Sequence, residues 1–218
     1  ITRPGGESLI ARSTASSRKR KDGQTGVISN ICFRKDSSNV FSACSFDGTI
    51  GIYDLRSIQH SSEEKIDSCG IFKTHKYGAS QSKFLNDGWS LVTVGRKENI
   101  LKIWDLRKLG QGEVFPVTSI LLEGYNNNQR IYFDSSKDDS VIAGSGAALY
   151  RFRNSNREIL TRADSTISSV TVASDDGAIA YSEGSRTNRF YIDSDSEDLL
   201  NEDKICKSSK ISLLLARD

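Results

Sequence analysis

Short stretches in which apolar or β-branched residues alternate with polar ones run along the whole chain. Turn-forming pairs separate these stretches, among them Asp47-Gly48, Asp87-Gly88 and Asp176-Gly177. Such pairs tolerate the positive φ of a hairpin turn. No segment of useful length has helical periodicity, and the sequence contains only 2 prolines. The pattern predicts an all-β protein built from antiparallel meanders.

The meanders repeat at a constant interval. The spacing from Phe33 to Tyr53 equals the spacing from Phe84 to Trp104. Two weaker copies follow, each shorter by one residue, from Phe133 to Phe152 and from Val172 to Tyr191. A single meander cannot bury its own apolar faces, so several must pack around an axis. The repeat predicts a β-propeller of the WD-repeat (WD40) type.

Four copies would fill about half of a common seven-bladed ring. The sequence contains no methionine, not even at position 1. We therefore expect the C-terminal blades of a larger ring, with sheets over residues 27–57, 78–108, 128–154 and 166–193. The expected division is a basic loop and linker region at 1–26, blades at 27–57, 58–108 and 109–154, and a last blade with an acidic loop and a closing strand at 155–218.

An aromatic residue followed by aspartate ends the third strand of the first two copies, as Tyr53-Asp54 and Trp104-Asp105. We expect each ring to pack against the neighbouring blade and each aspartate to turn the chain outward. His75 lies at a spacing from Trp104 that suits the histidine which holds this tryptophan in many WD blades. The aspartate expected in the preceding turn is missing, because residues 96–99 read Arg-Lys-Glu-Asn. The tetrad therefore reads as incomplete, and His75 is either its member or a loop residue.

The net charge of +2 predicts no partner by itself. Its distribution is more informative, because a basic cluster and an acidic cluster lie near opposite ends of the chain. The basic cluster suits an RNA-attracting loop, a nuclear import signal or a solvated surface loop. The basic cluster comprises Arg18, Lys19, Arg20 and Lys21, and the acidic one comprises Asp193, Asp195, Glu197 and Asp198.

The cysteines bear on the cellular compartment of the protein, and the length of its apolar runs bears on membrane insertion. The 4 cysteines show no CxxC spacing, and three of them lie in or beside strand-like runs, where a free thiol behaves as a small hydrophobe. This usage favours a reducing, intracellular compartment. No apolar run approaches the roughly 18 residues needed to span a bilayer, so we expect no membrane partner.

Enzymatic chemistry finds little support in the sequence. His60 and His75 are its 2 histidines, and neither has metal-ligand spacing with cysteine or histidine. Gly144-Ser145-Gly146 lies in a strand-turn pattern, where close packing explains the glycines. No Gly-x-Ser-x-Gly elbow occurs. We expect a non-catalytic protein without a metal or cofactor.

Two short sequence motifs indicate which WD-repeat family the chain resembles. Gly95-Arg96-Lys97 with Trp104-Asp105-Leu106-Arg107 close behind, and then the heptad Asn128-Gln129-Arg130-Ile131-Tyr132-Phe133-Asp134, resemble the telomerase Cajal body protein family. The strand after the basic cluster, from Gly23 to Ser29, is also similar to that family. The sequence departs from the family pattern in its third copy, which ends Leu149-Tyr150-Arg151-Phe152-Arg153 instead of Trp-Asp, and in its short acidic loop after Tyr191.

The resemblance implies a nuclear scaffold that binds H/ACA-type small guide RNAs of Cajal bodies and, in vertebrates, the telomerase RNA, and that helps to localise them. Arg96 and Lys97 would then neutralise phosphates, while Asn128, Gln129 and Arg130 would contact base edges. The sequence leaves open whether these two groups share one rim of the propeller.

Two other interpretations remain open. Arg96 and Lys97 also fit a solvated turn, and Arg130 also fits an ion pair with Asp134 or Asp105. A generic WD-repeat adaptor that binds peptides at the propeller rim is the rival function. Tyr77, Trp89 and Tyr125 are candidates for base stacking, although most aromatic residues in blades are packing residues.

Overall fold

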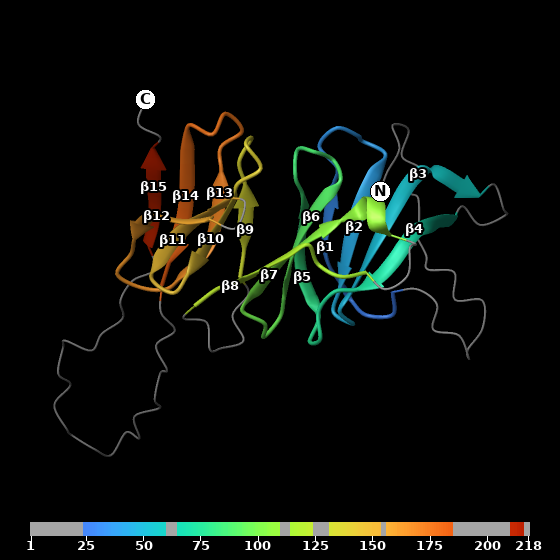
Figure 1. Cartoon of the computed structure of the whole chain (residues 1–218), viewed down its shortest axis with the longest axis horizontal. Helices are drawn as coiled ribbons and strands as arrows, with labels where there is room; N and C mark the ends of the chain where they lie inside the picture. Colours follow the sequence, from blue (N-terminus) through green and yellow to red (C-terminus); the bar gives the residue numbers. More distant parts are fainter. Residues whose placement is uncertain are drawn as a thin grey trace, which may run out of the picture.

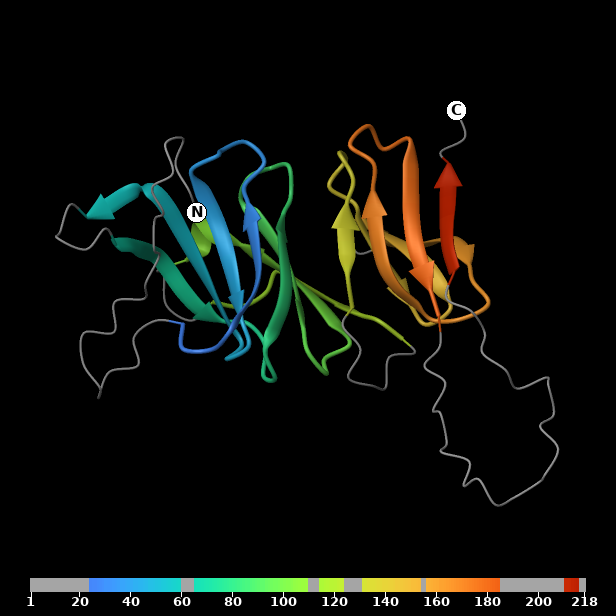
Figure 2. The same cartoon turned by 180° about the vertical axis from the view of Figure 1, so that it is seen from behind.

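The computed structural model describes residues 24–59, 65–109, 114–123, 131–153, 156–184 and 210–215; of residues 58–59 and 65–68 it describes the backbone alone. These residues form four antiparallel sheets that follow one another in chain order (Figure 1). Seen from behind, the first and second sheets again lie together on one side and the third and fourth on the other (Figure 2).

The first three sheets have four strands each, and in the fourth the described residues form three. The first contains β1 (Ile28–Phe33), β2 (Val40–Ser45), β3 (Thr49–Gln59) and β4 (Lys65–Lys73). The second contains β5 (Ala79–Phe84), β6 (Ser90–Gly95), β7 (Ile100–Asp105) and β8 (Thr118–Leu121), with a 3-10 turn, η1 (Leu106–Lys108), after β7. The third contains β9 (Phe133–Ser135), β10 (Val141–Ser145), β11 (Ala148–Arg153) and β12 (Asn156–Arg162). The fourth contains β13 (Ile167–Val172), β14 (Ala178–Glu183) and β15 (Lys210–Leu215).

The all-β propeller prediction is confirmed, but the limits of the sheets differ from the expected spans. β4 and β12 each pair with the aromatic-bearing strand before them, so the first and third sheets run past residues 57 and 154. In the fourth sheet β14 pairs with β13 and with β15, so this sheet runs past residue 193. Tyr191 itself and the acidic cluster lie outside the described residues.

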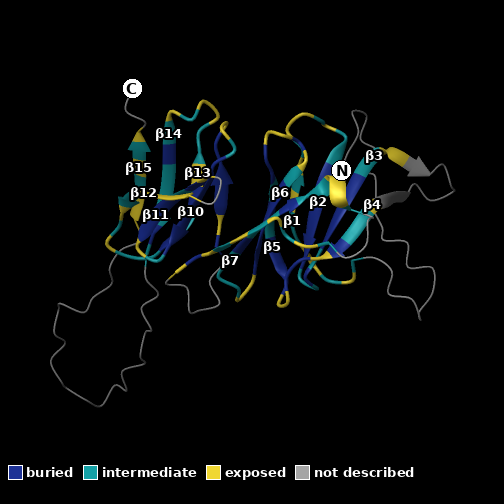
Figure 3. Ribbon diagram, in the orientation of Figure 1, coloured by how far each residue is buried: buried dark blue, intermediate teal, exposed yellow. Residues whose placement is uncertain are grey.

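Because successive side chains point to opposite faces, a single strand contributes to two hydrophobic cores. In β6, Leu91 packs between the first and second sheets, whereas its neighbour Val92 packs between the second and third. In β10, Val141 faces the second sheet, and Ile142 faces the fourth. Because successive side chains of a strand point to opposite faces, the two middle sheets are buried on both sides (Figure 3). This face-to-face stacking of twisted sheets is the packing that the sequence repeat requires.

Polar side chains join the first strands of neighbouring sheets. The Asn30 carboxamide oxygen on β1 accepts from the backbone N–H of Ser82 on β5 at 3.1 Å. The Gln81 side chain exchanges two hydrogen bonds with the backbone of Phe133 on β9, at 3.0 and 3.1 Å. Asp134 then accepts from the backbone N–H of Val172 at 3.0 Å. These bonds hold the first strand of each sheet in register with the first strand of the next sheet.

No helix in the described part of the chain is long and apolar enough to cross a membrane.

Candidate nucleic-acid interface

Three turns of the first two sheets meet at one end of the molecule, which we call the basic end: residues 46–48, 74–78 and 96–99. Backbone hydrogen bonds join them, since Thr74 N–H donates to the Gly48 carbonyl at 2.9 Å and Arg96 N–H donates to the Gly78 carbonyl at 2.8 Å. Gly78 has a φ of +113°, and a Cβ there would lie 2.9 Å from the Phe46 carbonyl oxygen. Glycine is therefore needed for the close approach of two turns.

Trp104 anchors this end from beneath through a buried chain of hydrogen bonds. Its Nε1–H donates to Thr93 Oγ1 at 2.9 Å, and Thr93 Oγ1 lies 2.9 Å from His75 Nε2. His75 Nδ1 lies 2.6 Å from a Glu98 carboxylate oxygen. Although His75 lies in the turn 74–78, it belongs to this network, because it is 1% exposed and both of its ring nitrogens have partners. The expectation of an incomplete tetrad is wrong: Glu98 takes the place of the missing aspartate.

The direction of these bonds defines the protonation of His75. Thr93 accepts from Trp104 and so directs its own hydroxyl hydrogen at His75 Nε2, which leaves the Nδ1–H to donate to Glu98. A neutral imidazole satisfies every group. Burial lowers the pKa of His75 to about 4, although Glu98 opposes this change. Partial burial raises the pKa of Glu98, but hydrogen bonds from His75 and from the backbone N–H of Lys76 bring it below its ordinary value.

The first sheet holds its turn with an equivalent carboxylate. Asp47 precedes Tyr53 by the same interval as Glu98 precedes Trp104. It accepts from the backbone N–H groups of Thr25 at 2.7 Å and Thr49 at 2.9 Å. Tyr53 donates its hydroxyl hydrogen to the Gln24 side-chain oxygen at 2.9 Å, so Gln24 stands where the second sheet has His75. Burial raises the pKa of Asp47, but these hydrogen bonds outweigh it and hold the pKa far below its ordinary value.

Both carboxylates of these turns are thus engaged by internal donors, and Glu98 also lies 3.6 Å from the Lys102 ammonium. Lys76, Arg96 and Lys97 are exposed, and the described residues include no carboxylate in an ion pair with any of the three. The Arg96 guanidinium lies 4.7 Å from the centroid of the Phe46 ring. Lys76 Nζ lies 5.1 Å from the centroid of Tyr77, a ring that is 50% exposed.

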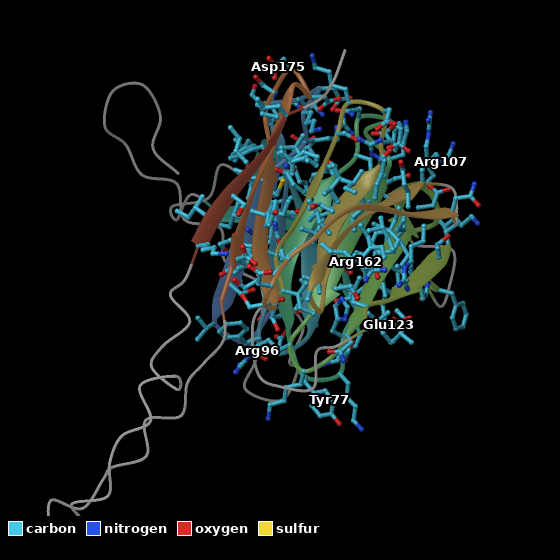
Figure 4. All side chains as sticks on the ribbon, turned by 90° about the vertical axis from the view of Figure 1, so that its left-hand side faces the viewer. Tyr77, Arg96, Arg107, Glu123, Arg162 and Asp175 are labelled. Carbon is cyan, nitrogen blue, oxygen red and sulfur yellow. The ribbon has the colours of Figure 1, made fainter. Side chains whose placement is uncertain are left out.

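The opposite end, which we call the paired end, comprises the turns at residues 34–39, 85–89, 136–140 and 173–177 and the Asp-Leu-Arg segments 54–56 and 105–107. Figure 4 shows Asp175 at this end and Tyr77 with Arg96 at the other. Here each arginine that follows lies within 4 Å of a carboxylate. The pairs are Arg34–Asp36 at 2.6 Å, Arg56–Asp54 at 2.6 Å, Arg107–Asp105 at 2.8 Å and Arg153–Asp138 at 3.6 Å. The hydrogen bond from Arg107 lowers the pKa of Asp105 to about 2.

The structure places Arg96 and Lys97 in the turn between β6 and β7. The segment after β8 leaves from the same end, because Leu122 N–H donates to the Asn99 carbonyl at 2.7 Å. Asn128, Gln129, Arg130 and the basic cluster from Arg18 to Lys21 lie outside the described residues. Of the carboxylates considered as alternative partners of Arg130, Asp134 is bonded by Lys83 and Asp105 by Arg107.

Sequence reasoning missed Thr93, Glu98 and Phe46 at this end. The interval shared by Asp47 and Glu98 before their aromatic residues was the signal that could have identified Glu98. Nothing in the sequence marks Phe46, because it acts across two sheets. No group of three His, Cys, Asp or Glu residues suited to a metal ion occurs within the described ranges.

Comparison with known proteins gives similarity in part of the chain. No protein-family model matches it. Telomerase Cajal body protein 1 from Bos taurus is 31% identical over 133 residues, which is 61% of this chain but 21% of that protein. The chain thus spans about a fifth of the length of the curated relative it matches. Together with the fold, this similarity supports a protein of the WD-repeat (WD40) type.

Two solved structures are similar in fold alone. The computationally designed Ika4 protein has a TM-score of 0.53 at 16% identity, with 89% of this chain and 94% of that chain covered. A chain of the mitotic checkpoint complex has a TM-score of 0.54 at 17% identity, with 74% of this chain and 46% of that chain covered.

Proposed function

We propose that the chain is part of a nuclear, non-catalytic scaffold that binds RNA through its basic end. The RNA class that fits the relative and the two sequence motifs is the H/ACA-type small guide RNA of Cajal bodies, including telomerase RNA where that RNA is of this type. The observation that carries the proposal is the set of exposed cations, Lys76, Arg96 and Lys97, which no carboxylate in the described part of the chain neutralises.

The rigidity of the platform supports this function. The three turns are joined by backbone hydrogen bonds and held from below by Trp104 and His75, so the cations project from a fixed base. Phosphate contacts position an RNA, whereas base-edge contacts give it sequence preference. In this scheme Arg96 and Lys97 bind phosphates, and Asn128, Gln129 and Arg130 supply the base contacts. The basic cluster Arg18, Lys19, Arg20 and Lys21 adds either a further contact surface or a nuclear address.

The test is filter binding of the full chain to an H/ACA-type guide RNA at several salt concentrations, with a box-mutated RNA beside it. Each phosphate contact on single-stranded RNA contributes about 0.7 to the slope of log affinity against log salt. Arg96→Gln and Lys97→Gln should each reduce the slope by about that amount and weaken both RNAs alike. Replacement of Asn128, Gln129 or Arg130 should instead reduce the preference for the intact box.

The matched control is the double variant Arg56→Gln with Arg107→Gln, which removes from the paired end as much charge as Arg96→Gln and Lys97→Gln remove together. Its affinity and salt slope should equal those of the unaltered chain. Reversal of Arg18–Lys21 to acidic residues separates the two roles of that cluster, because an address changes nuclear accumulation and leaves RNA affinity intact.

A peptide-binding adaptor is the second candidate, and Trp89 is the observation that favours it. This ring is 49% exposed at the paired end, with the Arg34 guanidinium 5.6 Å from its centroid. Exposed tryptophan beside arginine is typical of protein interaction hot spots. Equal affinity for both RNAs, unchanged by substitution of Arg96 or Lys97, would make this adaptor the better account.

A further inference from the structure

Tyr77 is an aromatic residue that the fold does not use for packing. Tyr53 and Tyr150 are buried, at 4% and 6% exposed, and Tyr132 is 38% exposed, whereas half of Tyr77 is exposed. Exposing a large ring forgoes the free energy that its burial would supply. The Arg96 N–H donates to the carbonyl of the neighbouring Gly78, and a Cβ on Gly78 would lie 2.9 Å from the Phe46 carbonyl oxygen, so the backbone next to Tyr77 is held while the ring is not buried.

The surroundings of Tyr77 suit a nucleotide better than an apolar group. The Lys76 ammonium lies 5.1 Å from the ring centroid, within the range of a cation–π contact. A second aromatic–cation pair lies across the same turns, where the Arg96 guanidinium packs on Phe46 at 4.7 Å. Aromatic rings and guanidinium planes are the two surfaces on which proteins stack unpaired bases. Exposed Lys97 adds a third cation to this end.

We infer that the basic end is a stacking platform for unpaired nucleotides, on which one base stacks against Tyr77 while the adjoining phosphates contact Lys76 and Lys97. The inference rests on the proposed RNA-binding function and specifies the form of RNA bound. A base inside a duplex is covered on both faces by its neighbours and offers no face to Tyr77. The platform therefore selects single-stranded segments, with little preference among bases, because every base has a π-face.

Trp89 provides a matched comparison within the same chain. Its exposed fraction is close to that of Tyr77 and it too has a cation beside its ring, but this cation, Arg34, is engaged by Asp36 at 2.6 Å. Aspartates crowd the turns around it, which repels phosphate. Removal of Trp89 therefore takes away an equally exposed aromatic ring from a place where we expect no RNA.

The experiment measures binding of the full chain to a short single-stranded RNA, to the same strand annealed in a duplex, and to a strand with an abasic position. Tyr77→Ala should weaken single-strand binding by about 5- to 150-fold, the effect typical of one lost base stack. It should leave the salt slope unchanged, because no charge is removed. Tyr77→Phe should retain most of the affinity, and Trp89→Ala should have no effect. The abasic strand should bind the unaltered chain more weakly and bind Tyr77→Ala as well as the intact strand does.

The outcomes distinguish a failure of the stacking platform from a failure of the RNA-binding function. If Arg96→Gln lowers affinity and salt slope while Tyr77→Ala changes nothing and the duplex binds equally well, the stacking platform is wrong and the RNA-binding function stands. If the chain binds neither strand, or if Arg96→Gln also has no effect, both are wrong. Thermal melting of Tyr77→Ala identifies any loss of folding, which its exposed position leads us not to expect.

Discussion

The two ends of the propeller segment carry similar residues and use them differently. Each presents an exposed aromatic ring beside a cation, Tyr77 with Lys76 at the basic end and Trp89 with Arg34 at the paired end. In two of the ion pairs at the paired end, Asp54–Arg56 and Asp105–Arg107, the aspartate lies two residues before its arginine. At the basic end the carboxylates face inward and accept from the backbone and from His75.

The difference shows that the position of a carboxylate matters more than its number. Asp47 and Glu98 accept hydrogen bonds that hold the turns together. Lys76, Arg96 and Lys97 nearby are exposed and have no carboxylate partner among the described residues. A chain with a net charge of only +2 can therefore present one strongly cationic end.

Trp104→Ala should destabilise the chain by about 3–5 kcal/mol, because a large buried aromatic side chain leaves a cavity between the first two sheets. The ring is 2% exposed, packs 5.3 Å from the Phe72 ring and donates to Thr93. Chemical denaturation measures the loss. Trp89→Ala at the paired end is the control and should cost less than about 1 kcal/mol, since that ring is half exposed. Equal losses would contradict the role given to Trp104.

As pH falls, the chain should lose stability first through His75 at the basic end, before the carboxylates of the paired end titrate. Since burial lowers the pKa of His75 to about 4 in the folded chain, the unfolded chain binds the proton first as pH falls from about 6.5. Stability should therefore fall between pH 6.5 and 4, by roughly 3 kcal/mol in all. Glu98 adds a further loss below its ordinary pKa, because its folded pKa is depressed.

The variant His75→Gln, which copies Gln24 of the first sheet, tests this prediction. Stability curves of both chains over that pH range are the measurement, and the variant should lack most of the slope between pH 6.5 and 4. Asp105, whose pKa is lowered to about 2, should contribute nothing to that slope in either chain. An unchanged slope in His75→Gln would show that another group titrates.

Gly78→Ala should cost about 1–3 kcal/mol, because the residue has a φ of +113° and its new Cβ would press on the Phe46 carbonyl. The variant should also weaken RNA binding, since it separates the turn of Tyr77 from that of Phe46. Gly177→Ala at the paired end is the control. Its Cβ would meet only the Asp175 side chain, at 3.3 Å, so we expect less than about 1 kcal/mol in a denaturation experiment.

The smallest effect is a gain. Asp54→Asn with Asp105→Asn should release Arg56 and Arg107 from their ion pairs, while the amide oxygens still accept from the turn N–H groups. The paired end would then attract RNA weakly. The slope of log affinity against log salt should rise by up to about 0.7 for each arginine that gains a phosphate contact. A lower affinity than that of the unaltered chain would argue against the neutralising role of these aspartates.

The fold was predictable because it depends on a pattern with period 2 and on a repeated aromatic interval, both local properties of the sequence. The sequence left open whether each sheet has three or four strands, and it did not locate the fourth strands, again for a local reason. β8 has four residues and β12 is rich in charge, so neither shows the alternation of a half-buried strand. In the last sheet the interval from Val172 to Tyr191 gave no information on β15, which lies further along the chain.

The candidate interface was less predictable because it depends on which turns share an end. With four strands in the second sheet, the segment after β8 leaves from the same end as the turn of Arg96 and Lys97; with three strands it would leave from the opposite end. The sequence did not give this count. Glu98 was overlooked because its longer side chain reaches His75 from a position where an aspartate was expected.

Ultraviolet crosslinking of an H/ACA-type guide RNA to the full chain, followed by mass spectrometry of the crosslinked peptides, tests the central claim most directly. Aromatic residues in contact with bases crosslink efficiently, and each end of the molecule carries one that is half exposed. The account predicts crosslinks in peptides that contain Tyr77 and the Arg96–Lys97 turn, and a loss of the former in Tyr77→Ala. Crosslinks confined to peptides that contain Trp89 would contradict it, because they would place the RNA at the paired end.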